Sequence, residues 1–273
     1  MPELPEVETI ARFLREGHAA QPSLLGKQVE EVHLEWPRTL VSPAPGDLPT
    51  RLIGTVVQRI DRRGKFLGIH FDRQSMLIHL RMSGDLLVQP LKSTLPAHTR
   101  LWICFTDGWL LAFNDPRKFG RVWLTDHPQE VLANLGPEPL DAAFTAEALY
   151  QKLISVRRQL KPLLLDQHFL AGLGNIYTDE SLHLAHLHPA RLSNTLTLSE
   201  TESLWQSIRE VLAAGIQSNG SSIDWVYRGG NFQNHFRVYQ QTGKPCPVCG
   251  TPIQRITIGQ RGTHFCPTCQ PIP

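Results

Sequence analysis

Four of the five cysteines form one regular pattern near the end of the chain. The pattern is Cys-x2-Cys, sixteen further residues and a second Cys-x2-Cys, and its members are Cys246, Cys249, Cys266 and Cys269. Two such pairs of thiolates are typical of a structural zinc site, with no ligand position left open for a catalytic water. Disulfide bonds are the alternative, but the cytosol expected for this chain keeps thiols reduced. We predict one structural Zn2+ and no organic cofactor.

The stretch PELPEVE at residues 2–8 could also perform chemistry. Pro2 is small enough for Met1 to be removed, and the exposed secondary amine would be a nucleophile if the fold held it in place. An α-amino group has a pKa of about 8 against about 10.4 for lysine, so roughly a tenth is unprotonated at neutral pH. The alternative is a simple helix start, with Pro5 as the first helical residue. That alternative does not account for Pro2 and Glu3.

The predicted secondary structure around these groups differs between the two halves of the chain. From about residue 28 to 124 the pattern is strand-like, and Thr106-Asp107-Gly108 separates the runs LWICF and WLLAF as a hairpin turn would. Cys104 lies inside the first run, so we expect it to be a buried packing residue. A short amphipathic helix should precede the strands, because apolar residues recur there at helical spacing: Val7, Ile10, Ala11 and Leu14.

The second half is predicted to be helical. Thr145 should cap a helix that runs to about Arg158, and Ser199 with Glu202 should form the capping box of a later helix. The polar, Gly-rich residues 218–235 predict a loop. Between the two cysteine pairs, two strand-like runs joined by Gly259-Gln260-Arg261-Gly262 predict a hairpin with Arg261 at or near its tip.

These patterns predict an α+β protein of two domains. The divisions are an N-terminal β-sandwich domain at 1–134, a Pro- and Gly-containing linker at 135–144, a helical domain at 145–235 and a zinc module at 236–273. No apolar run approaches the roughly 20 residues of a membrane span, and the acidic start is no signal peptide. A cytoplasmic location follows as the expectation.

Charge is distributed unevenly, although the net charge is only +2. Lys and Arg outnumber Asp and Glu by 12 to 5 in residues 51–123 and by 5 to 1 in residues 220–273. Two basic surfaces that converge would form a groove for a phosphate backbone. Two solvated faces that never meet are the alternative.

PELPEVE, LAGLGNIYTDE (170–180) and the zinc hairpin together resemble the formamidopyrimidine-DNA glycosylase family. These bacterial base-excision enzymes remove 8-oxoguanine and ring-opened purines from DNA. The motifs RRGKFL, HLRMSG, NDPRKFG and RGTHFCPTCQ extend the resemblance over nearly the whole chain. It implies a β-sandwich, a helix–two-turn–helix domain with a four-cysteine zinc-finger hairpin, and a monomeric glycosylase and AP lyase. The implied partner is double-stranded DNA that contains an oxidised base.

The resemblance also implies catalytic roles. The Pro2 nitrogen would attack C1′ of the damaged nucleotide, expel the base and form a Schiff base, after which β- and δ-elimination cut the strand. Glu3 matches the acid/base carboxylate, and Glu6 is a candidate for a supporting role. Lys65 matches the lysine of β-elimination, and Arg261 the finger arginine that binds phosphates. Solvated turn charges are the alternative for Lys65 and Arg261.

A base inside a duplex must be flipped out before it can react. Met82, Arg117 and Phe119 match the family's three inserted side chains, with core packing as the alternative for Met82 and Phe119. The DNA-contacting positions implied by the resemblance are His79, His98, Arg117, Arg157, Asn175 and Tyr239. The family commonly has lysine at Arg157, which changes the contact geometry. Free backbone N–H groups at the helix start beside Asn175 should also bind a phosphate. The loop 218–235 would close over the lesion.

Two other functions fit part of the pattern. An endonuclease VIII-like glycosylase for oxidised pyrimidines shares the fold, but PELPEVE and Arg117-Lys118-Phe119 argue against it. A non-catalytic zinc protein that binds damaged DNA would keep the basic surfaces and the finger, yet would have no use for a free Pro2.

Overall fold

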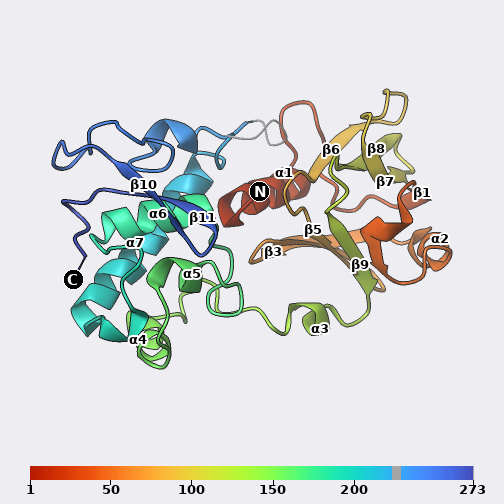
Figure 1. Ribbon diagram of the computed structural model, residues 1–273. Coiled ribbons are helices and arrows are strands. Elements are labelled where there is room, and N and C mark those ends of the chain that lie inside the picture. The colour runs from red at the N-terminus through yellow and green to blue at the C-terminus, as the bar shows by residue number, and fades with distance from the viewer. Residues whose placement is uncertain (223–228, 273) are drawn as a thin grey trace. The chain divides into compact units, whose positions relative to one another are not determined.

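Helix α1 (Leu4–Glu16) buries the apolar residues that predicted it, and it is the first element of a computed structural model that describes residues 1–222 and 229–272 (Figure 1). The helix begins at Leu4, so Pro5 is its second residue rather than its first. Contacts divide the chain into two units. The first contains Met1–Pro2 and Glu6–Ala133, and the second contains Glu3–Pro5, Asn134–Ser221 and the chain from Gly229 onward.

The first unit is a β-sandwich, as the alternating pattern predicted. One sheet has the strand order β2-β9-β5-β4-β3 and the other β1-β7-β8-β6. The strands are β1 (Val29–Leu34), β2 (Leu40–Ser42), β3 (Val57–Arg63), β4 (Phe66–Phe71), β5 (Ser75–His79), β6 (Asp85–Pro90), β7 (Thr99–Phe105), β8 (Trp109–Asn114) and β9 (Arg121–Thr125). Alternate residues of both sheets, with α1 and α2 (Asp47–Leu52), fill one apolar core. The predicted hairpin turn joins β7 to β8, and Cys104 packs in a small apolar cluster with Leu110 and Ala112.

The second unit is helical. After α3 (Pro128–Leu132) of the first unit come α4 (Ala146–Ile154), α5 (Leu160–Leu164), α6 (Asn175–Leu184) and α7 (Leu198–Gln217). Thr145 caps α4 as predicted, since its hydroxyl accepts a hydrogen bond from the Ala148 amide at 3.2 Å. The helix ends at Ile154, short of the predicted end near Arg158. No helix among residues 1–222 and 229–272 is long and apolar enough to cross a membrane.

The predicted capping box of the last helix was wrong by two residues. Thr197 and Glu200, not Ser199 and Glu202, exchange the two capping hydrogen bonds. Both pairs satisfy the same sequence rule. The tertiary structure selects the earlier pair, because Glu200 also accepts a hydrogen bond from the Arg191 guanidinium at 2.8 Å.

The zinc module contains the predicted hairpin. Strands β10 (Gln254–Ile258) and β11 (Arg261–Phe265) pair antiparallel, with Ile258 opposite Arg261. The two turn residues, Gly259 and Gln260, have positive φ values of 54° and 63°. Such angles are typical of a type I′ turn, whose twist matches that of the strands. Arg261 is therefore the first residue after the tip.

Candidate functional site

The Glu3 carboxylate lies at the N-terminus of α6. One oxygen accepts a hydrogen bond from the Gly174 amide at 2.6 Å, and the other accepts one from the Ile176 amide at 3.0 Å. The Tyr177 amide lies 3.4 Å from the first oxygen, and only 3% of Glu3 is exposed. Backbone N–H groups and the positive end of the helix stabilise a negative charge at this position. The fold therefore holds the carboxyl group next to Pro2 in a defined place.

The prediction that backbone amides at the start of α6 bind a phosphate was wrong. The backbone amides that were expected to bind a phosphate beside Asn175 instead bind Glu3 of the same chain. Glycine is required at 174, because a Cβ there would lie 2.2 Å from the Glu3 Cδ atom. The Asn175 side chain donates to the carbonyl of Gly262 in the zinc hairpin at 3.2 Å.

Pro2 is buried, whereas 40% of Met1 is exposed. The chain just after Glu3 is anchored, because the Leu4 amide donates to the Gly172 carbonyl at 3.0 Å. While Met1 is attached, the Pro2 nitrogen is an amide and cannot act as a nucleophile. Removal of the exposed Met1 would produce an amine one residue from the fixed Glu3.

A buried ion pair supports the strand that starts with Arg261. The Lys161 Nζ atom lies 2.6 Å from Asp179 Oδ1 and donates to the Gly262 carbonyl at 2.8 Å, and Lys161 and Asp179 are both almost fully buried. The other Asp179 oxygen accepts from the His264 amide at 2.9 Å. Burial lowers the pKa of Lys161, although the charge of Asp179 opposes this shift. This network was not predicted, because no local pattern distinguishes such a buried pair from ordinary solvated charges.

Lys65 lies in the two-residue turn between β3 and β4, yet only 4% of it is exposed. It is therefore not a solvated turn charge. His79, at the end of β5, packs edge-on against Phe66. Burial and the charges of Arg81 and Lys65 lower the pKa of His79 to about 3, so its ring is neutral at neutral pH. A neutral imidazole of this kind can still donate one hydrogen bond to a phosphate.

Met82, Arg117 and Phe119 are exposed, with 41% of Met82 and 48% of Phe119 accessible. Core packing does not explain such exposed apolar side chains. The Arg117 guanidinium lies 5.3 Å from the centre of the Phe119 ring. The residues next to them have strained backbones, with φ values of 56° at Arg81 and 60° at Lys118.

The remaining predicted DNA contacts are dispersed over loops. His98 precedes β7 and Arg157 follows α4, and both are exposed. The Tyr239 ring packs against His264, and its amide donates to Glu180 at 2.8 Å. The buried Glu180 carboxylate also accepts from the amides of the two preceding residues, 237 and 238. Glu180 was not predicted, although it belongs to the motif LAGLGNIYTDE.

The four cysteines of the zinc module fit a tetrahedral metal site. All four sulfur atoms lie within 4.8 Å of one another, with 3.4 Å between Cys249 and Cys266 and 3.8 Å between Cys246 and Cys269. Four thiolates at the usual zinc–sulfur distance are about 3.8 Å apart. His183 of α6 lies 3.3 Å from the Cys246 sulfur, in the position of an outer hydrogen bond to a ligand.

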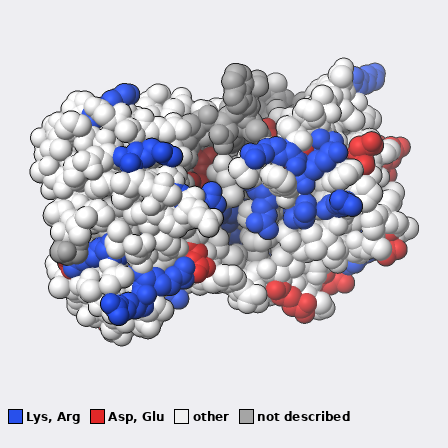
Figure 2. All heavy atoms as spheres, viewed as in Figure 1, with Lys and Arg blue, Asp and Glu red and all other residues white. Residues whose placement is uncertain are grey.

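Lys and Arg side chains gather over the strand-rich unit, around α1 and β5 (Figure 2). Exposed basic residues of this unit include Arg81, Arg117 and Lys118. A phosphate backbone is a suitable partner for such a surface.

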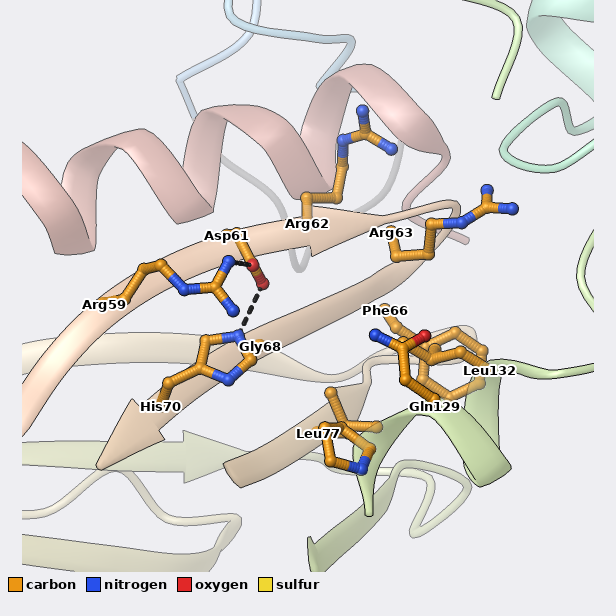
Figure 3. Close-up of a pocket in the computed structure, with 11 residues that line it drawn as sticks. Arg59, Asp61, Arg62, Arg63, Phe66, Gly68, His70, Leu77, Gln129 and Leu132 are labelled. Carbon is orange, nitrogen blue, oxygen red and sulfur yellow. Dashed lines mark hydrogen bonds and ion pairs between the residues drawn. The ribbon is translucent and has the colours of Figure 1, made fainter. Parts of the chain in front are cut away.

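A pocket of about 210 Å³ lies on the outer face of β3 and β4, beside α3 (Figure 3). Within it Asp61 accepts hydrogen bonds from Arg59 and from His70, the latter at 2.8 Å. Burial alone would raise the pKa of Asp61, but His70 and Arg59 outweigh it and lower the pKa. None of the predicted catalytic residues lines this pocket, and it is smaller than the roughly 300 Å³ of typical ligand sites.

Comparisons with known proteins cover almost the entire chain. Three family models match: the formamidopyrimidine-DNA glycosylase N-terminal domain at residues 1–122, the H2TH domain of the same enzyme at 135–226, and a zinc finger found in FPG and IleRS at 243–272. A formamidopyrimidine-DNA glycosylase of Chloroflexus aurantiacus is 44% identical, over 99% of this chain and 98% of the relative.

Solved structures agree with these matches. Lactococcus lactis Fpg (MutM), in complex with DNA containing N7-benzyl-Fapy-dG, has a TM-score of 0.92 and 37% identity, over 99% of this chain and 100% of the other. A MutM complex with DNA containing carbocyclic 8-oxo-G has a TM-score of 0.90 and 38% identity, with the same coverage.

Proposed function

Because the chain belongs to the formamidopyrimidine-DNA glycosylase family, we propose that it excises oxidised purines from duplex DNA and then cuts the strand as an AP lyase. Full-length relatives carry the name of this glycosylase, and solved relatives are bound to DNA containing Fapy-dG, carbocyclic 8-oxo-G or an abasic site. The observation that carries the proposal is the Glu3 carboxylate, held at the start of α6 one residue from the terminal amine that loss of Met1 would expose.

The proposed reaction begins when the Pro2 nitrogen attacks C1′ of the damaged nucleotide. The bond from C1′ to the base breaks, and its electrons leave with the base, which takes up a proton. The C1′–O4′ bond then breaks while Glu3 protonates O4′, and the nitrogen, which has lost its own proton, forms the C1′=N bond of an iminium ion. The resulting iminium ion makes the C2′ proton acidic, so its removal expels the 3′ phosphate (β-elimination), and a second elimination expels the 5′ phosphate.

Lys65 and Arg261 are proposed to serve the elimination steps. Lys65 is buried at a hairpin turn, where it can bind a backbone phosphate and transfer a proton. Arg261 is exposed at the zinc hairpin, and it hardly gives up a proton, so its role is to stabilise phosphate charge. The four cysteines would hold one Zn2+, whose contribution is structural, because it shapes the hairpin that presents Arg261.

Eversion of the lesion is proposed to depend on Met82, Arg117 and Phe119, whose exposed side chains can fill the vacated space and contact the orphaned base. Further DNA contacts are proposed at His79, His98, Arg157, Asn175 and Tyr239. The loop 218–235 is proposed to close over the lesion, but its residues 223–228 lie outside the described part of the chain.

The functional divisions are proposed to be the catalytic domain 1–134, the linker 135–144, the helix–two-turn–helix domain 145–235 and the finger 236–273. The family-model matches at 1–122, 135–226 and 243–272 support this division. We propose that the protein acts as a monomer in the bacterial cytosol, where its DNA substrate is located.

Borohydride trapping tests the proposal. The mature protein is incubated with a duplex containing 8-oxoguanine opposite cytosine, reduced, and digested for mass mapping of the cross-linked peptide. We expect the cross-link on Pro2, and no cross-link when Met1 is retained. A cross-link on a lysine, or none from protein that binds the duplex, would overturn the assignment. Faster cleavage of a thymine-glycol duplex than of the 8-oxoguanine duplex would favour the endonuclease VIII-like alternative.

A further inference from the structure

Three loops of the β-sandwich meet where β8 ends. Asn114, the last residue of β8, lies opposite the first residue of β6, Asp85, and the first residue of β7, Thr99. Both neighbouring strands run antiparallel to β8, so they begin at the end of the sheet where β8 finishes. The loop before β6 carries Met82, the loop before β7 carries His98, and residues 115–120 follow β8. Topology alone thus brings the exposed side chains of Met82, His98, Arg117 and Phe119 to the same end of the sheet.

The carboxylate of Asp115 binds two of these loops together. Asp115 is completely buried, and one of its oxygens accepts hydrogen bonds from the Ser83 hydroxyl and from the Arg117 amide, the latter at 3.2 Å. The other oxygen accepts from the Gly120 amide at 2.7 Å. Ser83 follows Met82 directly and is itself buried, because only 3% of it is exposed. The Asp115 carboxylate therefore connects both ends of the loop that carries Arg117 and Phe119 to Ser83, the residue after Met82.

The third loop is attached to Asp115 and to the residue before it. The Asp115 amide donates to the His98 carbonyl at 2.9 Å, and the His98 amide donates to the Asn114 side chain at 3.2 Å. The Arg100 guanidinium donates to the Asp115 carbonyl at 2.8 Å. His98 consequently has both its N–H and its C=O fixed by the Asn114-Asp115 dipeptide.

The loops adopt backbone conformations that need such support. Arg81 and Lys118 have positive φ values, which are unfavourable for residues with side chains. Gly84 and Gly120 pack so closely that a Cβ would lie 2.5 Å from the Leu80 carbonyl oxygen and 2.3 Å from the Phe113 ring, respectively. The Lys118 ammonium lies 3.9 Å from the centre of the Trp36 ring, so this side chain is anchored apart from the stacked pair of Arg117 and Phe119.

We infer that Asp115, through Ser83, is a positioning residue that holds Met82, His98, Arg117 and Phe119 as one preorganised unit for base eversion. The inference rests on the proposed function, which assigns DNA contacts to these four side chains. A carboxylate suits this place because three donors converge on its two oxygens. Asparagine has the same shape, but its NH2 group would face at least one of those donors and leave it unpaired.

The test compares Asp115→Asn, Ser83→Ala and Ser83→Thr with the wild type and with a control, Asp61→Asn. The control makes the same substitution at another hydrogen-bonded aspartate of the sandwich, which lies in β3 of the other sheet. Three quantities are measured for each variant: single-turnover excision of 8-oxoguanine from a duplex, fluorescence of 2-aminopurine placed beside the lesion, and borohydride trapping on a single-stranded abasic oligonucleotide. The last substrate needs no eversion.

We expect Asp115→Asn to slow excision from the duplex roughly ten- to a hundredfold and to reduce the 2-aminopurine signal, while trapping on the single strand stays within about twofold of the wild type. Ser83→Ala should show a smaller loss of the same kind, and Ser83→Thr, which keeps the hydroxyl, should restore it. Asp61→Asn should leave all three readouts unchanged.

Two results would overturn the inference. One is wild-type excision and eversion in both Asp115→Asn and Ser83→Ala. The other is an equal loss on the duplex and on the single strand in Ser83→Ala, since that pattern indicates general destabilisation instead of mispositioned loops. If the wild type itself forms no trapped complex, the proposed function fails, and the 2-aminopurine signal of the variants still decides the role of Asp115.

Discussion

At the scale of single residues, Glu3 combines two tasks. Its carboxylate accepts hydrogen bonds from the backbone amides at the start of α6. Glu3 also follows directly after Pro2, the residue proposed as the nucleophile. The first task explains why a carboxyl group can be buried there, since hydrogen bonds from backbone N–H groups compensate for the lost hydration. The second task follows only if the amine of Pro2 is free. A substitution of Glu3 therefore disturbs both structure and chemistry, and an experiment must separate them.

We expect Glu3→Gln to reduce single-turnover base excision by about 100-fold or more, because an amide cannot supply the proton. Duplex affinity should change by less than about tenfold, since the groups proposed to contact DNA remain. Excision kinetics and fluorescence anisotropy with a lesion duplex measure the two effects. Glu8→Gln is the matched control, because Glu8 belongs to the same helix but pairs with Arg62 instead of α6. Parallel losses of excision and affinity in Glu3→Gln would assign it a purely structural role.

At the scale of elements, α6 connects the parts of the second unit. Its start holds Glu3, Asp179 holds the strand that begins with Arg261, and Glu180 holds residues 237–239. His183, one turn further, contacts a zinc-ligating cysteine. The helix is therefore buried on all sides, polar residues included. A helix of this kind has no simple apolar stripe, so periodicity shows where it lies but not what it binds.

The start of α7 gives a prediction at this scale. Thr197→Ala should lower the free energy of unfolding of the helical unit by about 0.5–2 kcal/mol, because it removes the side chain that caps the Glu200 amide. Urea unfolding followed by far-ultraviolet circular dichroism measures the change. Ser199→Ala is the control, since Ser199 is exposed within the helix and should have little effect. A larger loss for Ser199→Ala than for Thr197→Ala would contradict the observed cap.

At the scale of the whole molecule, the sandwich and the zinc module have separate apolar clusters. The core of the sandwich uses residues between Val7 and Leu124, whereas the zinc module packs Val238, Ile253 and three of its cysteines together. So small an apolar cluster cannot order a hairpin alone, and the metal supplies the missing stabilisation. The hairpin in turn presents Arg261. Loss of zinc should therefore disorder the zinc module and remove the proposed DNA contact of Arg261, while the sandwich stays folded.

We expect zinc chelation to remove hydrogen-exchange protection from peptides within residues 243–272, while peptides from β3 to β8 keep theirs. DNA affinity should fall, and the slope of log affinity against log salt should decrease by about one because a phosphate contact is lost. Hydrogen-exchange mass spectrometry and salt-dependent binding measure these effects, and re-addition of zinc should reverse them. Equal loss of protection in the sandwich strands would show that the two cores are not independent.

The class of fold, the zinc ligands and the family can be predicted from the amino-acid sequence alone. Alternation with period two predicted the sandwich, the spacing of four cysteines predicted the metal site, and several motifs in a fixed order identified the relatives. The hairpin at Arg261 and the cap at Thr145 were also predicted correctly. Such features depend on neighbouring residues, and local sequence is sufficient to encode them.

The hydrogen-bond partner of each buried polar group, by contrast, depends on the tertiary structure. Glu3 occupies the amides that were predicted for a phosphate, Arg191 selects the cap of α7, and Asp115 joins loops that are separated by about thirty residues of sequence. Each of these groups could satisfy its hydrogen bonds in more than one way. The choice is set by residues brought together through long-range strand and helix packing, and no local pattern records those contacts.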